Sequence, residues 1–558
     1  MAQVLVGDYL FRRLREIGIT SVFGVPGDYE LALLDLIPSS NLSRIGSPNE
    51  LVAAYAADGY ARVKGAGALV TTLGPGELNA LCGIGGAFTE FVPVLHIVGY
   101  PNDMIKKSGR IFHHTLGDGS YDHYVNMSAE VSCATAILND ASTAAQEIDR
   151  VLNAMMYNSQ PGYIGIPQEI AFSRMEPSSL ATPIQRFLCT DANNTEVEVV
   201  SKILARLREA TRPVLVIDGG GAPQSWRDLA NALIKTLKVP HFSTALGKGI
   251  AKENSHLFCG SYLGAGTYHT VAPIMEESDC VLRVGSYLSD FNTGLFAEKV
   301  KQTVSINLER FHTTIGHEKY EAKMINVSAV SMTKGIKLKT ELVSHKWVPN
   351  NDYALQVPAR KPVKASSIEV IPHQWLWQCL TGYFRAGDLI CVETGTAQFG
   401  ISESYLPIDC DMWTQAIYGS IGYAAGASVG GSIAGQELGK YKRVIPITGE
   451  GSLQLTVQAM SLLSRYGITP VILIVNYKGY TVERILHGLH ALYNDVDDWN
   501  YGDIFKAMGP QANEIRTFRV KEASKLDDLL ASHEFNSANY PQARLSMPNQ
   551  LIGCRKAD

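Results

Sequence analysis

The sequence has few charged residues and no block of a single sign. Aspartate, glutamate, lysine and arginine make up 18% of its 558 residues, and the net charge is −5. Without a basic block, the chain has no electrostatic footprint for nucleic acid or an anionic membrane. It also lacks an apolar run that could span a bilayer, and its first residues do not form a signal-peptide pattern. We therefore expect a cytoplasmic protein that contacts neither nucleic acid nor membrane.

Cysteine pairs at metal or redox spacing are also missing. The nine cysteines are scattered, odd in number and include no Cys-x-x-Cys. This pattern predicts reduced core residues, and argues against a disulfide framework or a zinc site. His113 and His114 are adjacent, but no other histidine or cysteine stands nearby at ligand spacing, so we expect no metal there.

The length and the order of patterns indicate several α/β domains. A chain of this size is too long for one core. Buried strand patterns alternate with helical patterns, which is typical of doubly wound parallel sheets. We predict three such domains, at residues 1–182, 190–345 and 369–558. Residues 346–368 mix proline, asparagine and lysine and are predicted to be a linker.

One strand–helix–strand unit near the end of the chain carries a candidate binding site. A strand at 444–448 leads into a glycine turn that holds Glu450, a helix is expected from Ser452, and a second strand follows at 471–475. The two turns, at 449–451 and 476–479, should lie together at the carboxyl ends of parallel strands, where α/β sheets bind ligands. A helix start suits phosphate, and an acid beside it suits a bridging divalent cation. A plain tight turn with a solvated acid remains the alternative.

Residues 109–124 interrupt the regular patterns of the first domain. The segment holds two adjacent histidines and several glycines and has little periodicity, so it is predicted to be a loop. Loops carry function more often than they carry packing. A polar surface loop without a role is the competing interpretation.

Nine motifs, taken together, resemble the thiamine-diphosphate-dependent 2-oxo acid decarboxylases, above all the pyruvate, indolepyruvate and phenylpyruvate decarboxylases of fungi. Their order and spacing cover nearly the whole chain. The motifs are FGVPGDYELALLD (23–35), NELVAAYAADGYAR (49–62), GELNALCGIGGAFTEFVPVLHIVG (76–99), HHTLGDG (113–119), SDFNTG (289–294), TGT (394–396), YGSIGY (418–423), GEGSLQLTVQ (449–458) and GYTVERILHG (479–488).

The resemblance implies a fold, an assembly and a reaction. It implies a pyrimidine-binding domain at 1–182, a central domain at 190–345 and a diphosphate-binding domain at 369–558. It implies a homodimer or homotetramer with thiamine diphosphate between the first domain of one subunit and the third domain of its partner. The reaction would be non-oxidative decarboxylation of a 2-oxo acid to an aldehyde through a thiamine diphosphate enamine. Acyloin-forming carboligation on the same cofactor, and a non-catalytic or cofactor-free protein that reuses the fold, are the alternatives.

The resemblance also assigns roles to single residues. Glu50 matches the glutamate that hydrogen-bonds the aminopyrimidine ring, and should be buried against that ring. Asp28, His113, His114 and Glu483 match the acid/base cluster around the reacting carbon. The positions that match cofactor contacts are Pro26, Gly27, Glu50, Thr394, Gly395, Thr396, Gly419, Ser420, Ile421, Gly449, Gly451, Ser452, Asn476, Gly479 and Tyr480.

The chain departs from the family pattern at the magnesium turn. The family has an aspartate there, followed by two adjacent asparagines, whereas this chain has Glu450, Asn476 and Tyr477. The remaining metal candidates are Glu450, Asn476 and the carbonyl of Gly479. Mg²⁺ demands near-ideal octahedral geometry, so a longer acid and a tyrosine that crowds the turn predict weakened or lost cation binding. Gln398 and the loop after His114 are further candidates for lining the substrate pocket.

Overall fold

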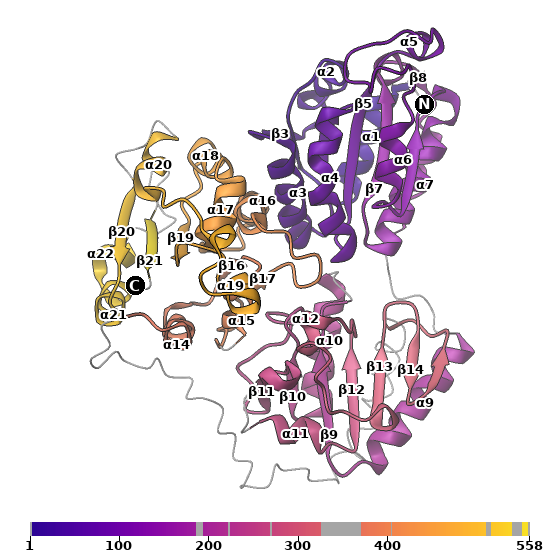
Figure 1. Ribbon diagram of the computed structural model, residues 1–558. Coiled ribbons are helices and arrows are strands. Elements are labelled where there is room, and N and C mark those ends of the chain that lie inside the picture. Colours follow the sequence, from indigo (N-terminus) through magenta and orange to yellow (C-terminus); the bar gives the residue numbers. More distant parts are fainter. Residues whose placement is uncertain are drawn as a thin grey trace.

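The computed structural model describes most of the chain as three bodies, each built on one sheet (Figure 1). The residues described are 3–185, 193–220, 224–267, 271–324, 370–402, 404–508, 515–537 and 550–555. The linker predicted at 346–368 lies outside these ranges. The α/β fold class is confirmed, because the sheets are mostly parallel and helices pack against them.

The first sheet has six strands, all parallel, in the order β3-β2-β4-β5-β7-β6. From β2 the chain moves to one edge and then returns to start β4 on the other side of β2. This reversal opens a crevice at the carboxyl ends of β2 and β4, the usual ligand position in such sheets. The strands are β2 (Ser21–Gly24), β3 (Ser43–Gly46), β4 (Gly67–Thr72), β5 (Val94–Tyr100), β6 (Ala134–Ile137) and β7 (Gly162–Pro167).

Helices cover the first sheet, and clear signals start and stop α3 among them. Asn49 accepts a hydrogen bond from the backbone N–H of Val52 at 2.8 Å, and Gly65 ends the helix in a left-handed conformation. Val4–Leu5, directly before α1, forms strand β1 against β8 (Arg174–Met175). The helices are α1 (Val6–Glu16), α2 (Leu31–Leu34), α3 (Glu50–Lys64), α4 (Pro75–Thr89), α5 (Asp103–Lys107), α6 (His123–Ala129), α7 (Ala141–Asn158) and α8 (Gln168–Ala171).

The central sheet has seven strands in the order β11-β10-β9-β12-β13-β14-β15. The sheet is mostly parallel, as predicted, and the β13–β14 and β14–β15 pairings at one edge are antiparallel, because short turns join these consecutive strands. The strands are β9 (Pro213–Ile217), β10 (His241–Ser243), β11 (Phe258–Ser261), β12 (Cys280–Val284), β13 (Ser305–Leu308), β14 (Thr313–Ile315) and β15 (Glu318–Tyr320). The helices are α9 (Asn194–Glu209), α10 (Gln224–Leu237), α11 (Ala272–Glu276) and α12 (Asp290–Thr293).

The third sheet has six parallel strands in the order β17-β16-β18-β19-β21-β20. Here the chain reverses between β16 and β18, so a second ligand crevice opens at their carboxyl ends. The strands are β16 (Asp388–Val392), β17 (Asp411–Trp413), β18 (Arg443–Gly449), β19 (Val471–Asn476), β20 (Arg516–Val520) and β21 (Gln550–Arg555).

The helix predicted from Ser452 differs from the structure at both its start and its middle. It begins two residues earlier, at Glu450, and a turn at Val457–Gln458 divides it. The hydroxyl of Thr456 donates to the carbonyl of Gly422 at 2.7 Å and anchors the chain at that break. The helices of this domain are α14 (His373–Tyr383), α15 (Thr396–Ile401), α16 (Tyr423–Leu438), α17 (Glu450–Thr456), α18 (Ala459–Arg465), α19 (Thr481–His487), α20 (Tyr501–Ala507), α21 (Ala523–Ala531) and α22 (His533–Ser537).

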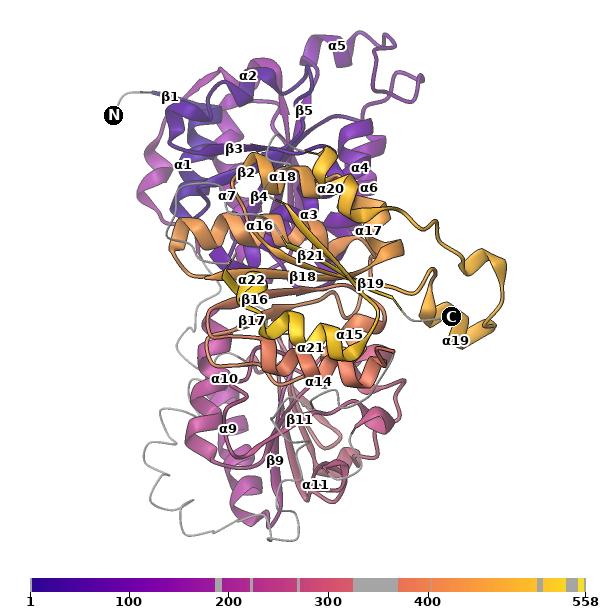
Figure 2. The same ribbon diagram turned by 90° about the vertical axis from the view of Figure 1, so that its left-hand side faces the viewer.

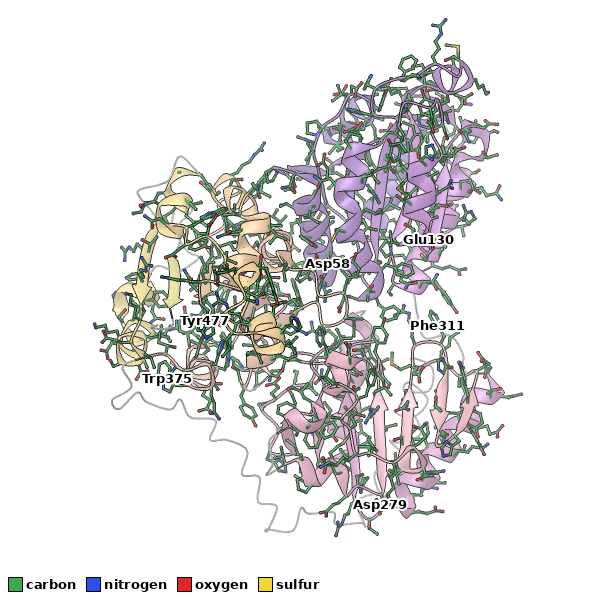
Figure 3. The ribbon with its side chains drawn as sticks, viewed as in Figure 1. Asp58, Glu130, Asp279, Phe311, Trp375 and Tyr477 are labelled. Atoms are coloured by element: carbon green, nitrogen blue, oxygen red, sulfur yellow. The ribbon has the colours of Figure 1, made fainter. Side chains whose placement is uncertain are left out.

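Helices α3 and α16 join the first and third domains. A Cβ atom at Gly430 would overlap the carbonyl of Ala56, so only glycine permits the backbones to come this close. Buried Asp58 accepts hydrogen bonds from Arg62 and from the hydroxyl of Tyr423, both at 2.7 Å. Figure 3 places Asp58 at this contact. The two candidate crevices therefore sit on a single rigid support.

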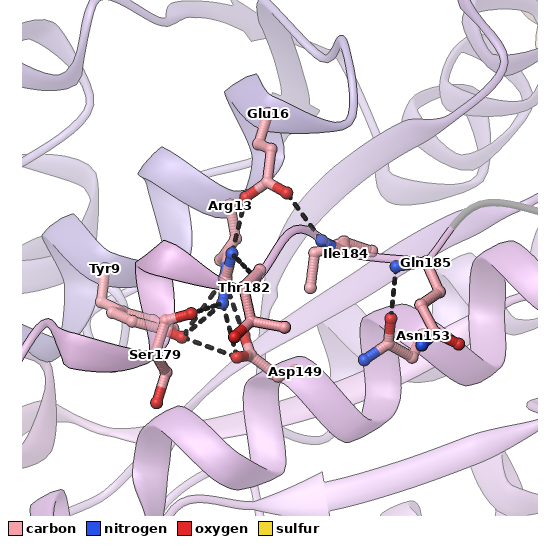
Figure 4. Close-up of polar contacts among 9 residues, drawn as sticks. All are labelled: Tyr9, Arg13, Glu16, Asp149, Asn153, Ser179, Thr182, Ile184 and Gln185. Carbon is pink, nitrogen blue, oxygen red and sulfur yellow. Dashed lines mark hydrogen bonds and ion pairs between the residues drawn. The ribbon is translucent and has the colours of Figure 1, made fainter.

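Arg13 ties the end of the first domain to its helices (Figure 4). Its fully buried guanidinium pairs with Asp149 at 2.6 Å and with Glu16 at 2.7 Å. It also donates to the carbonyls of Ser179 and Thr182, which belong to the segment leaving the domain. A buried guanidinium needs all of these acceptors, so the exit of the chain is fixed relative to α1 and α7.

Two expectations about composition can be compared with the structure. Five of the seven described cysteines are buried, but Cys82 is exposed and Cys133 is half-buried, so the core prediction is wrong for Cys82 and only partly met by Cys133. Cys82 lies on α4, where its sulfur is 3.5 Å from the hydroxyl oxygen of Ser420 in the third domain. It is therefore at the edge of a domain contact and outside the hydrophobic core. Within the described ranges, no helix is long and apolar enough to cross a membrane.

Candidate active site

The crevice of the first sheet holds three of the predicted acid/base residues. Asp28 follows β2, and its carboxylate lies 2.7 Å from Nε2 of His113. One ligand atom each from Asp28, His113 and His114 lie within 4.8 Å of one another. The ring of Tyr29 stacks on His113 at 4.9 Å between centroids. Both members of the Asp28–His113 pair are about half exposed, so they can reach a bound substrate.

A close backbone contact fixes the histidine loop in place. Gly74, at φ +75°, approaches the carbonyl of His114 so closely that a Cβ atom would collide with it. The buried carboxylate of Glu77 accepts the N–H of Gly74 and the hydroxyl of Tyr163, each at 2.9 Å. Burial raises the pKa of Glu77 to about 7. His114 itself has φ +69°, an uncommon conformation that this packing maintains.

Glu30 supports the Asp28 turn from below, and sequence reasoning missed it. Its carboxylate accepts the backbone N–H of Gly27, and burial raises its pKa to about 8. Glu30 stands between the polar turn at Asp28 and the apolar helix that begins at Leu31, and this sequence position does not indicate that its carboxylate is buried. Only the turn of the chain after β2 brings it beneath the crevice.

Glu50 begins α3 beside this crevice. Its carboxylate accepts a hydrogen bond from the side-chain amide of Asn79 at 2.7 Å. Glu50 is half-buried in the single chain, and a Cβ atom at Gly76 would lie 3.4 Å from it. Its position at the mouth of the crevice leaves the carboxylate available to a ligand.

Three glycine positions form an open cradle at the crevice of the third sheet. A Cβ atom at Gly395 would meet nothing within 4 Å, and one at Gly419 would first meet Thr394 at 3.5 Å. At Gly449 the nearest atom would be 3.8 Å away. The predicted contacts Thr396, Ser420, Ile421 and Ser452 lie on the same loops or on the first residues of the helices that follow. This open, glycine-lined edge fits a bound diphosphate.

Glu393 connects the loops of this cradle through hydrogen bonds, and the sequence did not identify it as a site residue. The fully buried carboxylate accepts the N–H of Gly422 at 3.1 Å and the hydroxyl of Thr448 at 3.2 Å. Burial raises its pKa to about 7. Its only sequence signal is that it stands directly before Thr394-Gly395-Thr396. Nearby, Gln398 is 2% exposed and its amide has no partner within the described part of the chain.

The turn expected to hold a cation is occupied by bonds within the protein. Oε1 of Glu450 accepts the N–H groups of Tyr477 and Gly479, at 3.2 and 2.7 Å. The longer acid thus reaches across the turn and caps its backbone. Burial raises the pKa of Glu450, against the opposing effect of these two bonds.

Asn476, the second candidate side chain, is also engaged, and Tyr477, which stands at the position of a family ligand, points away from the turn. Oδ1 of Asn476 accepts the N–H of Lys478 at 3.1 Å, and its amide faces Asp498. The ring of Tyr477 packs on His373 at 4.6 Å, against the core of α14 and α21 (Figure 3). The prediction that Tyr477 crowds the turn is therefore wrong. Glu450 and Asn476 thus each direct one side-chain oxygen to backbone N–H groups of the turn, and Tyr477 directs its ring away from it.

The structure does not bring Glu483 to the other acid/base residues of the same chain. Glu483 is exposed on α19, which Figures 1 and 2 both show far from α2 and the Asp28 turn. Tyr480 precedes α19 and packs against Gly451. Pro26 and Gly27 lie with Asp28 at the first crevice. The predicted site therefore falls into two groups, one on each crevice.

Comparison with known proteins identifies the class. The chain matches three family profiles in order. They are the thiamine pyrophosphate enzyme N-terminal TPP binding domain at 5–118, the central domain at 200–330 and the C-terminal TPP binding domain at 394–534. The two crevices fall within the first and last of these. The fold and site are thus those of a thiamine pyrophosphate enzyme.

Full-length relatives narrow the class. Pyruvate decarboxylase of Aspergillus terreus is 37% identical over 97% of this chain and 94% of its own length. Pyruvate decarboxylase of Aspergillus fumigatus is 38% identical over 98% of this chain and 94% of its own length. Pyruvate decarboxylase isozyme 3 of Saccharomyces cerevisiae is 36% identical over 96% of this chain and 94% of its own length. The chain belongs to the thiamine-diphosphate-dependent 2-oxo acid decarboxylases. It is a carbon–carbon lyase that catalyses non-oxidative decarboxylation with thiamine diphosphate.

Proposed function

We propose that this decarboxylase converts pyruvate, or a 2-oxo acid of similar size, to the aldehyde at the Asp28 crevice. The names of the three relatives support pyruvate. The arrangement of Asp28, His113 and His114 supports the site, because it places a carboxylate and two imidazoles around one point. We assign these three atoms to proton transfer, although their spacing would also suit a metal ion. The proposal keeps the domain limits 1–182, 190–345 and 369–558.

Two sets of residues would hold thiamine diphosphate. Glu50 would bond its aminopyrimidine ring, with Asn79 orienting the carboxylate. The cradle at Gly395, Gly419 and Gly449 would hold the diphosphate, with Thr394, Thr396, Ser452 and Tyr480 at its edges. When bound, the cofactor supplies the carbon nucleophile and the electron sink that decarboxylation requires.

The acid/base residues would then move protons near the reacting carbon. A general acid must reach the atom that it protonates within hydrogen-bond distance. His113 holds its proton position through its 2.7 Å bond to Asp28, and His114 is fixed by the Gly74 contact. Glu483 would complete the set from the other domain.

A second copy of the chain would bring the two groups of residues together. Glu483 lies far from Asp28 within one chain, and the segment that follows it exposes a row of apolar side chains. Their exposed fractions are 71% at Ile485, 76% at Leu486, 65% at Leu489, 82% at Leu492 and 67% at Tyr493. Exposed apolar patches of this kind mark interfaces. We propose a homodimer or homotetramer, which Leu486→Asp should dissociate in analytical ultracentrifugation. A monomeric wild-type protein with full activity would refute this assembly.

The proposed dependence on magnesium is weak. The changes at Glu450 and Tyr477 support this, because Oε1 of Glu450 is bonded to backbone N–H groups and the ring of Tyr477 packs on His373. A cytoplasmic setting is also part of the proposal, supported by the five buried free cysteines.

Calorimetric titration with thiamine diphosphate, before and after chelation, tests the proposed function. Binding at micromolar strength or better, followed by release of CO₂ and aldehyde from a panel of 2-oxo acids, is the expected result. Acyloin as the main product would favour carboligation. Absence of cofactor binding in every condition would overturn the proposal.

A further inference from the structure

The turn at residues 477–479 contains a fixed positive group that belongs to the protein. Arg484, on α19, donates from Nη2 to the carbonyl of Lys478 at 2.8 Å and from Nη1 to the carbonyl of Tyr477 at 3.3 Å. A Cβ atom at Gly479 would overlap this guanidinium. The side chain is 21% exposed, so the charge sits partly inside the turn.

The guanidinium also keeps a donor unused. Nε of Arg484 is buried and has no hydrogen-bond partner within the described residues. A buried N–H without an acceptor is costly, and an anionic oxygen is its best partner. The donor thus points to a ligand that carries oxygen and negative charge.

The same turn bonds to the protein with groups that a divalent cation would use. Glu450 bonds two of its N–H groups, and the side chain of Tyr477 lies in the core. A divalent cation here would have to share the turn with the guanidinium, and like charges repel most strongly in partly buried sites. Both observations follow from one change, the replacement of metal ligands by groups that bond to the protein.

We propose that Arg484 takes the place of the divalent cation in this turn, so that the chain binds the diphosphate of its cofactor without metal. This inference rests on the proposed function, since it concerns the same cofactor. Its guanidinium would face the diphosphate, and Glu450 would serve to hold the turn rather than to bind metal.

The charges around Arg484 are consistent with this role. Its ion pair with Asp495, at 2.6 Å, involves a carboxylate that is 57% exposed and screened by water. Asp498 faces Asn476, and Glu450 faces backbone N–H groups. Lys478 is exposed, and its side chain makes no hydrogen bond or ion pair with the described residues of the turn. It is therefore a matched control, with the same charge one residue from Gly479.

The experiment measures thiamine diphosphate binding to the full chain by calorimetry, in chelator and in excess Mg²⁺. For the wild type we expect dissociation constants that agree within about threefold in the two conditions. Arg484→Gln should weaken binding at least about tenfold in chelator, because a charge-assisted contact is lost. Arg484→Lys should recover part of the loss, and Lys478→Gln should bind like the wild type. Thermal unfolding verifies that each variant is folded.

The possible results distinguish a failure of the proposed role of Arg484 from a failure of the proposed decarboxylase function. Wild-type binding that is tenfold or more tighter with Mg²⁺ would overturn the role of Arg484 and leave the decarboxylase proposal supported. Metal-independent binding that Arg484→Gln leaves unchanged would also overturn it. No binding in either condition would overturn both. If Arg484→Gln and Lys478→Gln weakened thiamine diphosphate binding equally, the loss would reflect the positive charge of the region in general. A specific contact of Arg484 would then be rejected.

Discussion

The crevices of the first and third sheets have the same topology but have diverged differently from the family pattern. Each lies where the chain reverses direction in a parallel sheet. The first keeps Asp28, Glu50, His113 and His114 at the family positions, with buried carboxyls behind them. The third keeps its open glycine cradle, but Glu450 and Tyr477 have turned toward the protein.

The difference shows that the two halves of such a site can change independently. In the proposed function, proton transfer depends on the carboxylate and imidazole side chains of the first crevice. Diphosphate binding depends mainly on positive charge and N–H groups, which several chemical groups can supply. The third crevice could therefore lose metal ligands while the first retained its acids and bases.

Glu50→Gln should have the largest effect. Loss of the carboxylate should lower turnover by about 10³-fold, within the range known for general acid–base groups. Steady-state decarboxylation and thermal unfolding are the measurements, and the unfolding midpoint should stay within a few degrees. Turnover within threefold of the wild type would place the site elsewhere.

Asp28→Asn should come next. The 2.7 Å bond to His113 would lose its charge, and kcat/KM should fall by about 10²-fold with cofactor affinity unchanged. Glu147 forms an exposed ion pair with Arg150, at 2.6 Å, on α7 and outside the cluster. Glu147→Gln is therefore the control and should stay close to wild-type activity. Equal losses in the two variants would contradict a special role for Asp28.

Stability should decrease as pH rises. Burial raises the pKa of Glu30 to about 8 and of Glu393 to about 7, above the ordinary 4.5, so the folded state binds these protons more tightly than the unfolded state. Their contribution is complete below about pH 4.5 and is lost as pH rises through 7 to 8. The unfolding midpoint of cofactor-free protein should therefore decrease as pH rises from about 4.5 to 8.

One variant tests whether Glu393, at the crevice of the third sheet, causes part of this decrease in stability with rising pH. Glu393→Gln keeps an acceptor for the N–H of Gly422 but cannot ionise. It should reduce the decline by about 3 kcal/mol of unfolding free energy, since the pKa of Glu393 rises from 4.5 to about 7 and each pKa unit is worth about 1.4 kcal/mol. An unchanged slope would mean that Glu393 is not the titrating group.

The smallest effect is expected from restoring the family turn. Glu450→Asp with Tyr477→Asn should create an oxygen ligand set and shorten the acid, so that cofactor affinity becomes about tenfold higher with Mg²⁺ than in chelator. Titration calorimetry in both conditions measures this ratio. A ratio near one would show that these two residues do not account for the changed turn.

Much of the fold was predictable, because buried strands and glycine turns leave local signals. The strand at 444–448 and its parallel neighbour at 471–475 are confirmed nearly to the residue, as β18 and β19. The break after Thr456 was not, since it depends on a hydrogen bond to Gly422 from another loop. The antiparallel edge of the central sheet likewise has only short, weak strand signals.

The sequence by itself determined the family, the reaction class and the residues around Asp28, because ordered motifs over a whole chain are specific. Only the tertiary structure decided where the altered residues point. Tyr477 packs against His373, Glu450 bonds the backbone, and Arg484 enters the turn from a later helix. Such contacts join segments that are remote in sequence, and side-chain direction follows from packing rather than from residue type.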